Sequence, residues 1–309
     1  MQETREAILE TLVAGTESGP ELAERLDVSR AAVWKHIEAL REAGFEIESD
    51  GDGYVLESVP EFGGKAVAFG LDAPYSIEYH ERIPSTNERA RELAGAGAEN
   101  VVVLADEQTG GRGRLDRDWE SPSGGIWLSV VIRPEVPAAH APIFTLAAAV
   151  ATARAVRECG VDAEIKWPND VLVDGQKLAG ILTEMEGEAD RISWLVVGIG
   201  LNANIDPNDL LTEGNPTSLR ALIGGVNRRD LTQRVLETFD AVTQDLDDVL
   251  PAWRELAGTI GQRVRVETPD RTITGEAVDV QFPGTLVVET EEGRVDVASG
   301  ACEHLRGEE

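Results

Sequence analysis

The hydrophobic pattern changes its period twice along this 309-residue chain, and this limits the folds that the chain can adopt. As far as about residue 57, apolar residues recur mostly at helical spacing. From about residue 71 to residue 258, short apolar runs alternate with helical segments, and from residue 259 onward the apolar residues lie in short alternating runs. A single all-helical or all-β core does not produce three such patterns. The sequence therefore predicts a multidomain α+β protein.

The first pattern predicts three helices followed by a hairpin. Residues 4 to 14 form the first helix, Gly19-Pro20 opens the second, and Ser29 caps a third that runs from Arg30 to Ala43. Two short alternating runs then flank the turn at residues 50–53. The residues expected to face the helical core are Ile8, Leu9, Leu12, Val13, Leu22, Ala23, Leu26, Val33, Ile37 and Leu40. Three helices and a hairpin predict a winged helix-turn-helix over residues 1–58.

Charge opposes the DNA-binding role that this fold suggests. Arg30, Lys35, His36 and Arg41 are expected to face outward from the third helix, where they could meet a major groove and its phosphates. Residues 1–57 nevertheless carry five bases against fourteen acids, so the basic surface typical of a DNA binder is missing. The alternative is a small helical domain that only mediates contacts.

The whole chain is strongly acidic, with 57 Asp and Glu against 28 Lys and Arg and a net charge of -29. The acids are dispersed, and only four of the bases are lysines, which indicates a protein kept soluble in concentrated salt. The alternative is an ordinary acidic protein. Only two cysteines are present, and no apolar run reaches transmembrane length, so we expect a cytoplasmic protein without disulfides or a membrane span. The four histidines are scattered and predict no zinc cluster.

The loop from Gly110 to Trp119 contains three glycines and three arginines, and it follows the apolar run at residues 101–105. Glycine permits positive φ and a close approach to a ligand. Guanidinium groups match the oxygens of phosphates and carboxylates. The segment predicts an anion-binding loop; the alternative is a solvated surface loop.

Other polar groups lie where strands and helices are expected to end. Ser85, Thr86 and Asn87 cap a predicted helix and suit a polar, neutral ligand, although plain capping also accounts for them. Asn169 and Asp170 follow a proline that interrupts a strand, and Lys177 begins the next strand and should point into a cleft. Residues 198–202 end a strand with glycines. Residues 59–70 are expected to form a linker.

Four segments occur in order at close spacing: Gly110 to Arg114, Lys166 to Asp170, Lys177 to Leu182 and Gly198 to Asn202. Together they resemble the biotin protein ligases, and the flanking domains resemble the bifunctional type that is also the biotin operon repressor. The resemblance implies a winged helix over residues 1–58, a linker over 59–70, a biotin- and ATP-binding catalytic domain with a mixed sheet over 71–258, and a small SH3-like β barrel over 259–309.

The resemblance also implies a two-step reaction. Biotin and Mg-ATP form biotinyl-5′-AMP and pyrophosphate, and the biotinyl group then passes to a lysine of a biotin carboxyl carrier protein. The expected catalytic residues are Lys177, Arg114 and Asp170. No metal site is expected from the protein alone; Mg²⁺ would arrive with ATP, and Asp170 could help to hold it. The expected biotin-binding residues are Ser85, Thr86, Asn87, Gln108, Arg112, Gly113, Arg114 and Lys177. The expected nucleotide- and phosphate-binding residues are Arg112, Arg114, Lys166, Asn169 and Asn202, and Trp119 is expected to pack under the loop.

Further implied partners are operator DNA and a second copy of the chain. Two alternatives stay open at this point. One is a biotin-sensing DNA-binding regulator in which ligase activity is secondary or absent. The other is a lipoate-type ligase, which the Lys166 to Asp170 segment and the fused winged helix disfavour.

Overall fold

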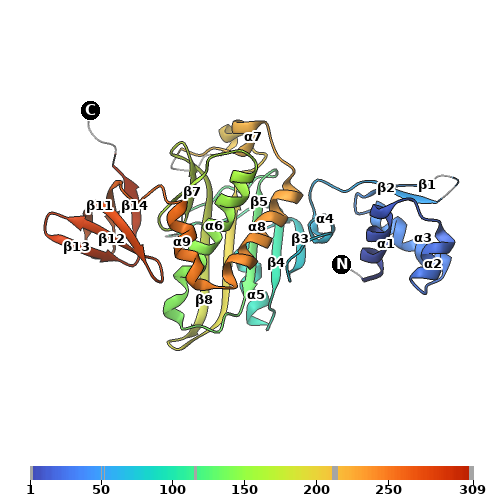
Figure 1. The fold of residues 1–309 in the computed structure, drawn as a ribbon, viewed down its shortest axis with the longest axis horizontal. Helices are drawn as coiled ribbons and strands as arrows, with labels where there is room; N and C mark the ends of the chain where they lie inside the picture. The colour runs from blue at the N-terminus through green and yellow to red at the C-terminus, as the bar shows by residue number, and fades with distance from the viewer. Residues whose placement is uncertain (1–2, 50, 52, 115–116, 211–214, 306–309) are drawn as a thin grey trace. The chain divides into compact units, whose positions relative to one another are not determined.

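The computed structural model describes residues 3–49, 51, 53–114, 117–210 and 215–305. The chain forms two compact units, Met1–Asp72 and Ala73–Glu309 (Figure 1). Each unit has its own core.

The first unit is a helix-turn-helix with a hairpin. It contains α1 (Glu3–Ala14), α2 (Gly19–Arg25), α3 (Arg30–Arg41), β1 (Glu46–Ser49), β2 (Tyr54–Ser58) and α4 (Gly64–Ala68). Ser18 and Glu21 form a capping box at the start of α2, and the Ser29 hydroxyl accepts from the backbone N–H of Ala32 at the start of α3. The helical pattern placed the core of this unit correctly except at Val13, which is 65% exposed. Val13 lies one position beyond the stripe formed by Ile8, Leu9 and Leu12.

The predicted linker over residues 59–70 is not an extended segment. Residues Gly64–Ala68 form α4, in which Ala66 and Val67 are buried. Phe69 packs edge-on against Phe45 of the helical core, with 6.2 Å between the ring centroids. Glycines at positions 63 and 64 suggested a flexible segment, but the four apolar residues that follow them gain more from burial in the first unit.

The second unit is organised around a seven-stranded mixed sheet with the strand order β3-β4-β5-β9-β8-β7-β6. The strands are β3 (Ser76–Ile83), β4 (Val101–Gln108), β5 (Ile126–Ile132), β6 (Glu164–Lys166), β7 (Asp170–Val173), β8 (Gln176–Glu188) and β9 (Arg191–Leu201). Among the described strands of this sheet, β3 and β4 are the one parallel pair. The helix α5 (Thr86–Gly95) connects them, as a parallel pair requires.

The two faces of the sheet carry different layers. On one face, Asn87 of α5 lies against Gly198, which pairs with Leu182. On the other face, the next residue along β8, Thr183, bonds to Thr145 of α6 (Pro142–Glu158) at 2.8 Å. Because successive side chains of a strand point to opposite faces, α5 and α6 cover opposite sides.

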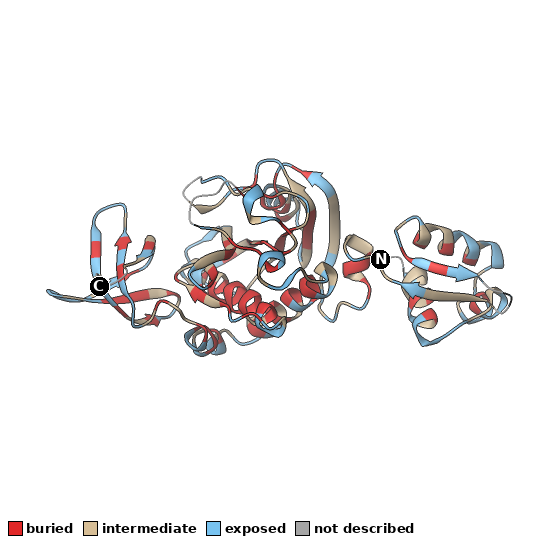
Figure 2. Ribbon diagram, turned by 90° about the horizontal axis from the view of Figure 1, so that it is seen from above, coloured by how far each residue is buried: buried red, intermediate tan, exposed pale blue. Residues whose placement is uncertain are grey.

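The helix α6 is the central core helix of this unit, and twelve of its seventeen residues are buried (Figure 2). The segment Ala138–Glu158, which also includes the short 3₁₀ helix η2 (Ala138–His140), is apolar and long enough to cross a membrane by composition alone. It is 72% buried within the protein, as is typical of a core helix.

Helices α8 (Arg228–Thr243) and α9 (Val249–Glu255) pack on α6. The short 3₁₀ helix η4 (Leu246–Asp248) separates them. Pro251 is in the first turn of α9, where a missing N–H costs no hydrogen bond. The remaining short elements are η3 (Pro207–Asp209) and α7 (Leu219–Ile223), and α7 is capped by Ser218.

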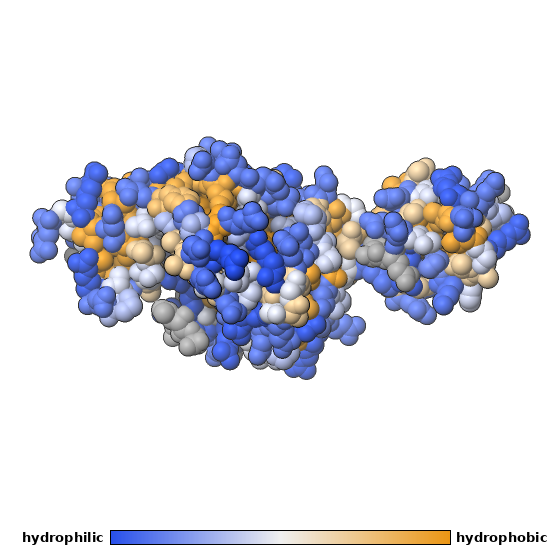
Figure 3. Space-filling model, turned by 90° about the horizontal axis from the view of Figure 1, so that it is seen from below, coloured by the Kyte–Doolittle hydropathy of each residue, from blue (hydrophilic) through white to orange (hydrophobic). Residues whose placement is uncertain are grey.

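The C-terminal part of this unit is an antiparallel sheet with the order β13-β12-β11-β10-β14. Its strands are β10 (Arg263–Glu267), β11 (Thr272–Gln281), β12 (Thr285–Thr290), β13 (Gly293–Val297) and β14 (Ala301–His304). Among the described residues β13 and β14 do not pair with each other, so this sheet is not a closed barrel. Hydrophilic residues cover most of the face of the molecule seen in Figure 3, as the acidic composition predicts.

Candidate functional site

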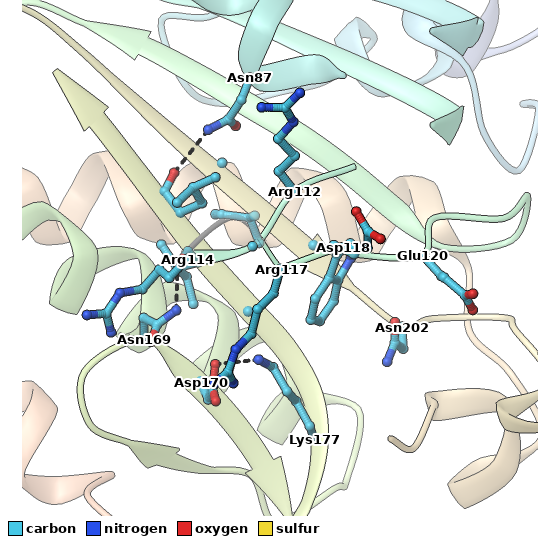
Figure 4. A pocket seen from close by; sticks show the side chains of 18 of the residues that line it. Asn87, Arg112, Arg114, Arg117, Asp118, Glu120, Asn169, Asp170, Lys177 and Asn202 are labelled. Atoms are coloured by element: carbon cyan, nitrogen blue, oxygen red, sulfur yellow. Dashed lines mark hydrogen bonds and ion pairs between the residues drawn. The ribbon is translucent and has the colours of Figure 1, made fainter. Parts of the chain in front are cut away.

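A cavity of about 560 Å³ in the second unit gathers the predicted site residues. Its walls come from the N-terminus of α5, the arginine loop, the β6–β7 turn, and strands β8 and β9 (Figure 4). All twelve residues predicted for catalysis, biotin or nucleotide line it: Ser85, Thr86, Asn87, Gln108, Arg112, Gly113, Arg114, Lys166, Asn169, Asp170, Lys177 and Asn202. They come from six separate segments of the chain.

The arginine loop folds back on itself. Its two arms are joined by backbone hydrogen bonds from Gly113 to Arg117 (2.7 Å) and from Trp119 to Gly111 (2.9 Å). A Cβ at Gly111 would lie 2.4 Å from the Trp119 carbonyl oxygen, so glycine is required there for close approach. None of the three glycines has positive φ, which corrects one reason given for them above. Leu115 and Asp116 lie outside the described residues.

The indole of Trp119 lies on two glycines of the sheet. Gly180 and Gly200 pair across β8 and β9, and a Cβ at Gly200 would lie 2.6 Å from the indole nitrogen. Among the described residues this buried nitrogen has no hydrogen-bond partner. The ammonium of Lys177 lies 5.0 Å from the ring centroid, within the range of a cation–π contact. The two glycines therefore create a flat floor that the ring covers.

Positive side chains gather at one end of the cavity. The Lys177 ammonium is paired with Asp170, with 2.7 Å between Nζ and Oδ1. The Arg114 guanidinium donates to Asn169 Oδ1 (3.1 Å), and Asn169 donates to the carbonyl of Ile181 (2.8 Å). Burial lowers the pKa of Arg114, and the nearby charge of Asp170 opposes that shift. In Figure 4 the side chain of Arg117 also projects toward Asp170 and Lys177.

Uncharged hydrogen-bonding groups gather at another part of the cavity. The Ser85 hydroxyl caps α5 by accepting from the N–H of Glu88. The Gln108 side-chain oxygen accepts from the backbone N–H of Thr86 (2.8 Å) and lies 3.0 Å from the Thr86 hydroxyl. The Gln108 amide donates to Ser121 Oγ at 2.9 Å, which fixes the orientation of the amide. This group suits a neutral polar ligand with its own N–H and C=O groups.

A second layer behind these groups was not predicted. Ser129, fully buried on β5, lies 2.8 Å from Thr86 Oγ1 and 2.6 Å from Asn87 Oδ1. A Cβ at Gly198 would lie 2.0 Å from Asn87 Oδ1, so this glycine makes room for the asparagine. One signal was available in the sequence, because Ser129 is the only polar residue in the apolar run from Ile126 to Ile132.

Asn202 lies at the end of β9 and is 2% exposed. Its amide donates to the carbonyl of Thr217 (3.0 Å), and its buried Oδ1 has no partner among the described residues. Thr217 is itself held in place, because its backbone N–H donates to the carbonyl of Lys177. Asn202 therefore presents an unused acceptor at the cavity wall.

The C-terminal sheet contributes to the same cavity, which the sequence gave no reason to expect. Gly300, Ala301 and Cys302 line it, and the Gly300 carbonyl accepts from Arg114 at 3.3 Å. Burial raises the pKa of the Cys302 thiol to about 11, so the thiol is inert at neutral pH.

The junction between this sheet and the β6–β7 turn is hydrogen-bonded at two points. The Trp167 indole donates to the Gly284 carbonyl (2.8 Å), and the Trp167 backbone N–H donates to Thr259 Oγ1 (2.9 Å). The Thr259 hydroxyl in turn lies 2.9 Å from His304 Nε2. Burial, together with the charge of Lys166, lowers the pKa of His304, which favours the neutral ring.

The residues predicted to contact DNA are all on α3 in the first unit. Arg30 and Lys35 are exposed. His36 is half-buried, and burial with the charges of Arg5 and Lys35 lowers its pKa. Arg41 is engaged inside the unit, where it donates to the Ile47 carbonyl and pairs with Glu38. Sequence reasoning overlooked Trp34, which is 58% exposed between Arg30 and Lys35 on the same face.

The described residues hold no group of three or more His, Cys, Asp or Glu placed to bind a metal ion. Asp170 is the carboxylate closest to the cationic end of the cavity, and it is paired with Lys177.

Three family models match the chain in order. Residues 4–55 match an HTH domain, residues 79–202 match the biotin/lipoate A/B protein ligase family, and residues 259–305 match the biotin protein ligase C-terminal domain.

Known proteins match over most of the chain. The bifunctional ligase/repressor BirA of Bacillus subtilis is 39% identical over 94% of this chain and 95% of its own length. The biotin–[acetyl-CoA-carboxylase] ligase of Mycobacterium tuberculosis is 34% identical over 70% of this chain and 84% of its own. The biotin protein ligase of Aquifex aeolicus, solved with biotin and ATP, has a TM-score of 0.64 at 26% identity, covering 75% of this chain and 99% of that one.

Proposed function

The chain belongs to the biotin protein ligase family, of the type with an N-terminal helix-turn-helix, and on that premise we propose that it is a biotin–protein ligase. It activates biotin with ATP to give biotinyl-5′-AMP and pyrophosphate. It then transfers the biotinyl group to a lysine of a biotin carboxyl carrier protein.

One observation carries the choice of substrate: the cavity has an uncharged hydrogen-bonding part and a cationic part. Biotin has a neutral ureido head at one end and a carboxylate at the other. Gln108 and Thr86 offer acceptors to the N–H groups of the head, while Lys177, Arg112 and Arg114 offer positive charge to the carboxylate and the phosphates. Lipoate has a dithiolane ring without N–H or C=O groups, so it would leave the first set unpaired.

The floor between the two parts suits the apolar middle of biotin. The Trp119 ring, which lies on Gly180 and Gly200, forms it. A thioether ring and its aliphatic chain would bury apolar surface there without displacing a hydrogen bond.

The cationic part suits the chemistry of adenylate formation. Lys177 neutralises the biotin carboxylate while an oxygen of that carboxylate attacks the α-phosphorus and pyrophosphate leaves. In the transfer step the carrier amine attacks the acyl carbon, and the same charge stabilises the phosphate of the departing AMP. Arg114 and Gly113 hold the loop over the mixed anhydride and exclude water. Asp170, held at 2.7 Å from Lys177, can accept a proton from the incoming carrier lysine.

The nucleotide lies toward Asn202, Lys166 and Asn169 in this proposal. The free Oδ1 of Asn202 can accept from the exocyclic amine of adenine. Magnesium would enter bound to ATP and neutralise phosphate charge, with Asp170 as the carboxylate nearest to it.

Each flanking part has a proposed role. The C-terminal sheet, which we propose to be SH3-like, completes the phosphate side through Gly300. The first unit binds operator DNA as one half of a homodimer, and the cytoplasm is the expected compartment. A regulator without ligase activity is the alternative, and the complete cavity disfavours it.

The proposal is tested by biotin-dependent exchange of labelled pyrophosphate into ATP, followed by transfer to a carrier domain detected with avidin. The assays should span low salt to multimolar potassium, because the dispersed carboxylates repel one another when unscreened. Exchange that responds to lipoate and not to biotin would refute the substrate.

A further inference from the structure

The buried hydroxyl of Ser129 lies behind the proposed ureido site, and its proton can be located by counting donors. Asn87 donates its two amide protons to Glu184 Oε2 (2.8 Å) and to the Leu182 carbonyl (3.3 Å). Glu184 is paired with Arg91 at 3.2 Å, so it is a carboxylate that accepts. The oxygen of the Asn87 amide therefore faces Ser129.

An amide oxygen cannot donate. The 2.6 Å contact between Ser129 Oγ and Asn87 Oδ1 therefore uses the single proton of the serine. The remaining hydroxyl proton, that of Thr86, is shared between two contacts: 2.8 Å to Ser129 Oγ and 3.0 Å to Gln108 Oε1. We assign it to Ser129, the shorter of the two contacts. The protons run in one direction, from Thr86 to Ser129 to Asn87.

This direction has a consequence at the cavity wall. Thr86 Oγ1 and Gln108 Oε1 lie 3.0 Å apart, and Gln108 Oε1 already accepts from the Thr86 backbone N–H. With the Thr86 proton directed to Ser129, the two oxygens carry no proton between them. A pair of acceptors this close is complementary to one N–H donor placed between them.

We infer that Ser129 is a positioning residue for recognition of the ureido head: it draws the Thr86 proton away, so that Thr86 Oγ1 and Gln108 Oε1 together accept one ureido N–H. The inference rests on the proposed function. In Ser129→Ala, Gln108 Oε1 is the remaining acceptor for the Thr86 proton, which then occupies the place of the ligand N–H.

The expected effect of Ser129→Ala is biotin binding that is about three- to tenfold weaker, the range expected for one net hydrogen bond. The KM for ATP should not change, because the serine lies behind the uncharged part of the cavity. Ser129→Cys, which keeps the size and a weak donor, should give an intermediate loss.

The matched control is Thr152→Val. Thr152 is equally buried, and its hydroxyl bonds to Ala148 O (2.8 Å) within α6, on the opposite side of the sheet. This variant loses a buried hydroxyl and some stability, but it should bind biotin as the wild type does.

The decisive experiment is a thermodynamic cycle that combines the Ser129→Ala substitution in the protein with N-methylation of the ligand. Binding is measured by calorimetric titration of the full-length protein. The ligands are biotin and its two singly N-methylated forms. The penalty for methylation is the ratio of the affinity for biotin to the affinity for the methylated form. For one methylated form, this penalty should be about three- to tenfold smaller in Ser129→Ala than in the wild type, because the acceptor pair is already lost in the variant. For the other form, the penalty should be unchanged.

Two outcomes overturn the inference in different ways. Equal methylation penalties in wild type and Ser129→Ala would refute the role of Ser129 and leave the ligase proposal standing. A wild-type protein that does not bind biotin in any salt would refute the proposed function and the inference together.

Discussion

Replacing Lys177 tests the centre of the proposed mechanism. Its ammonium lies 2.7 Å from Asp170 Oδ1 and 5.0 Å from the Trp119 ring, and its side chain is 26% exposed. Lys177→Ala removes the positive charge and leaves the carboxylate of Asp170 facing the phosphates. For two like charges about 5 Å apart at an effective dielectric constant of about 20, the repulsion is about 3 kcal/mol. This corresponds to roughly a hundredfold, within the range of about 10²–10³ for losing one transition-state contact.

The loss of rate in Lys177→Ala has two sources, the missing positive charge and the repulsion from Asp170. A second substitution separates them. If repulsion from Asp170 causes part of the loss, Asp170→Asn in the Lys177→Ala background should recover about tenfold or more of the pyrophosphate exchange rate. Asp170→Asn alone should slow transfer to the carrier more than it slows adenylation. Lys177→Arg should also fail, because a planar guanidinium does not fit the small space between Gly180 and the indole.

The assay is single-turnover pyrophosphate exchange at saturating biotin, with transfer to a carrier domain measured separately. Melting curves of each variant show whether the fold is intact. Wild-type turnover in Lys177→Arg would refute the role given to this lysine. A double variant no faster than Lys177→Ala would show that Asp170 does not repel the substrate.

Three further outcomes test other parts of the molecule. Arg114→Ala should release biotinyl-5′-AMP about ten- to a hundredfold faster, because the arginine loop loses the hydrogen bonds that the Arg114 guanidinium makes. A dissociation rate that is unchanged after rapid dilution would count against the proposal that Arg114 holds the loop over the adenylate. Burial depresses the pKa of His304, so the unfolded chain takes up a proton at a higher pH than the folded protein does. The stability that neutral His304 contributes is therefore present above about pH 6.5 and is lost as the pH falls toward the depressed pKa. His304→Gln keeps a hydrogen-bond partner for Thr259 and should flatten the decline of Tm between pH 7 and 5; parallel profiles would contradict this. On operator DNA, Trp34→Ala should weaken binding about tenfold at every salt concentration, because apolar contact is not screened, whereas Lys35→Ala should mainly change the salt dependence. Fluorescence anisotropy that gives the two variants the same salt profile would refute the distinction.

Sequence patterns picked out residues that line one cavity, but they gave less information about the elements around it. The motifs that carry charge or glycine were recognisable because their chemistry is unusual at a strand end: Lys177 after a tight turn, or Asn169 after a proline. The register of β8 and β9 could not be read from the sequence. It is this register that pairs Gly180 with Gly200 and so creates the floor for Trp119.

The differences from prediction have tertiary causes. Val13 follows the helical stripe in sequence, yet it remains 65% exposed. The contribution of Gly300 to the cavity depends on how the C-terminal sheet packs on the turn at Trp167, through contacts that join residues more than 90 positions apart. Local periodicity holds no information about contacts of that range.

Local charge, and not the total, decides what the cavity binds. The described lining residues include five cations and three carboxylates, a surplus of two positive charges in a chain of net charge -29. Two of the four lysines, Lys166 and Lys177, are among them. Because exposed charges beyond about 8–10 Å are screened at physiological salt, the acids on the surface cannot cancel this surplus. The same reasoning applies to α3, where Lys35 and Arg30 flank the exposed Trp34. The count of five bases against fourteen acids over residues 1–57 therefore does not by itself exclude DNA, because the field at that face depends on the groups within one screening length of it.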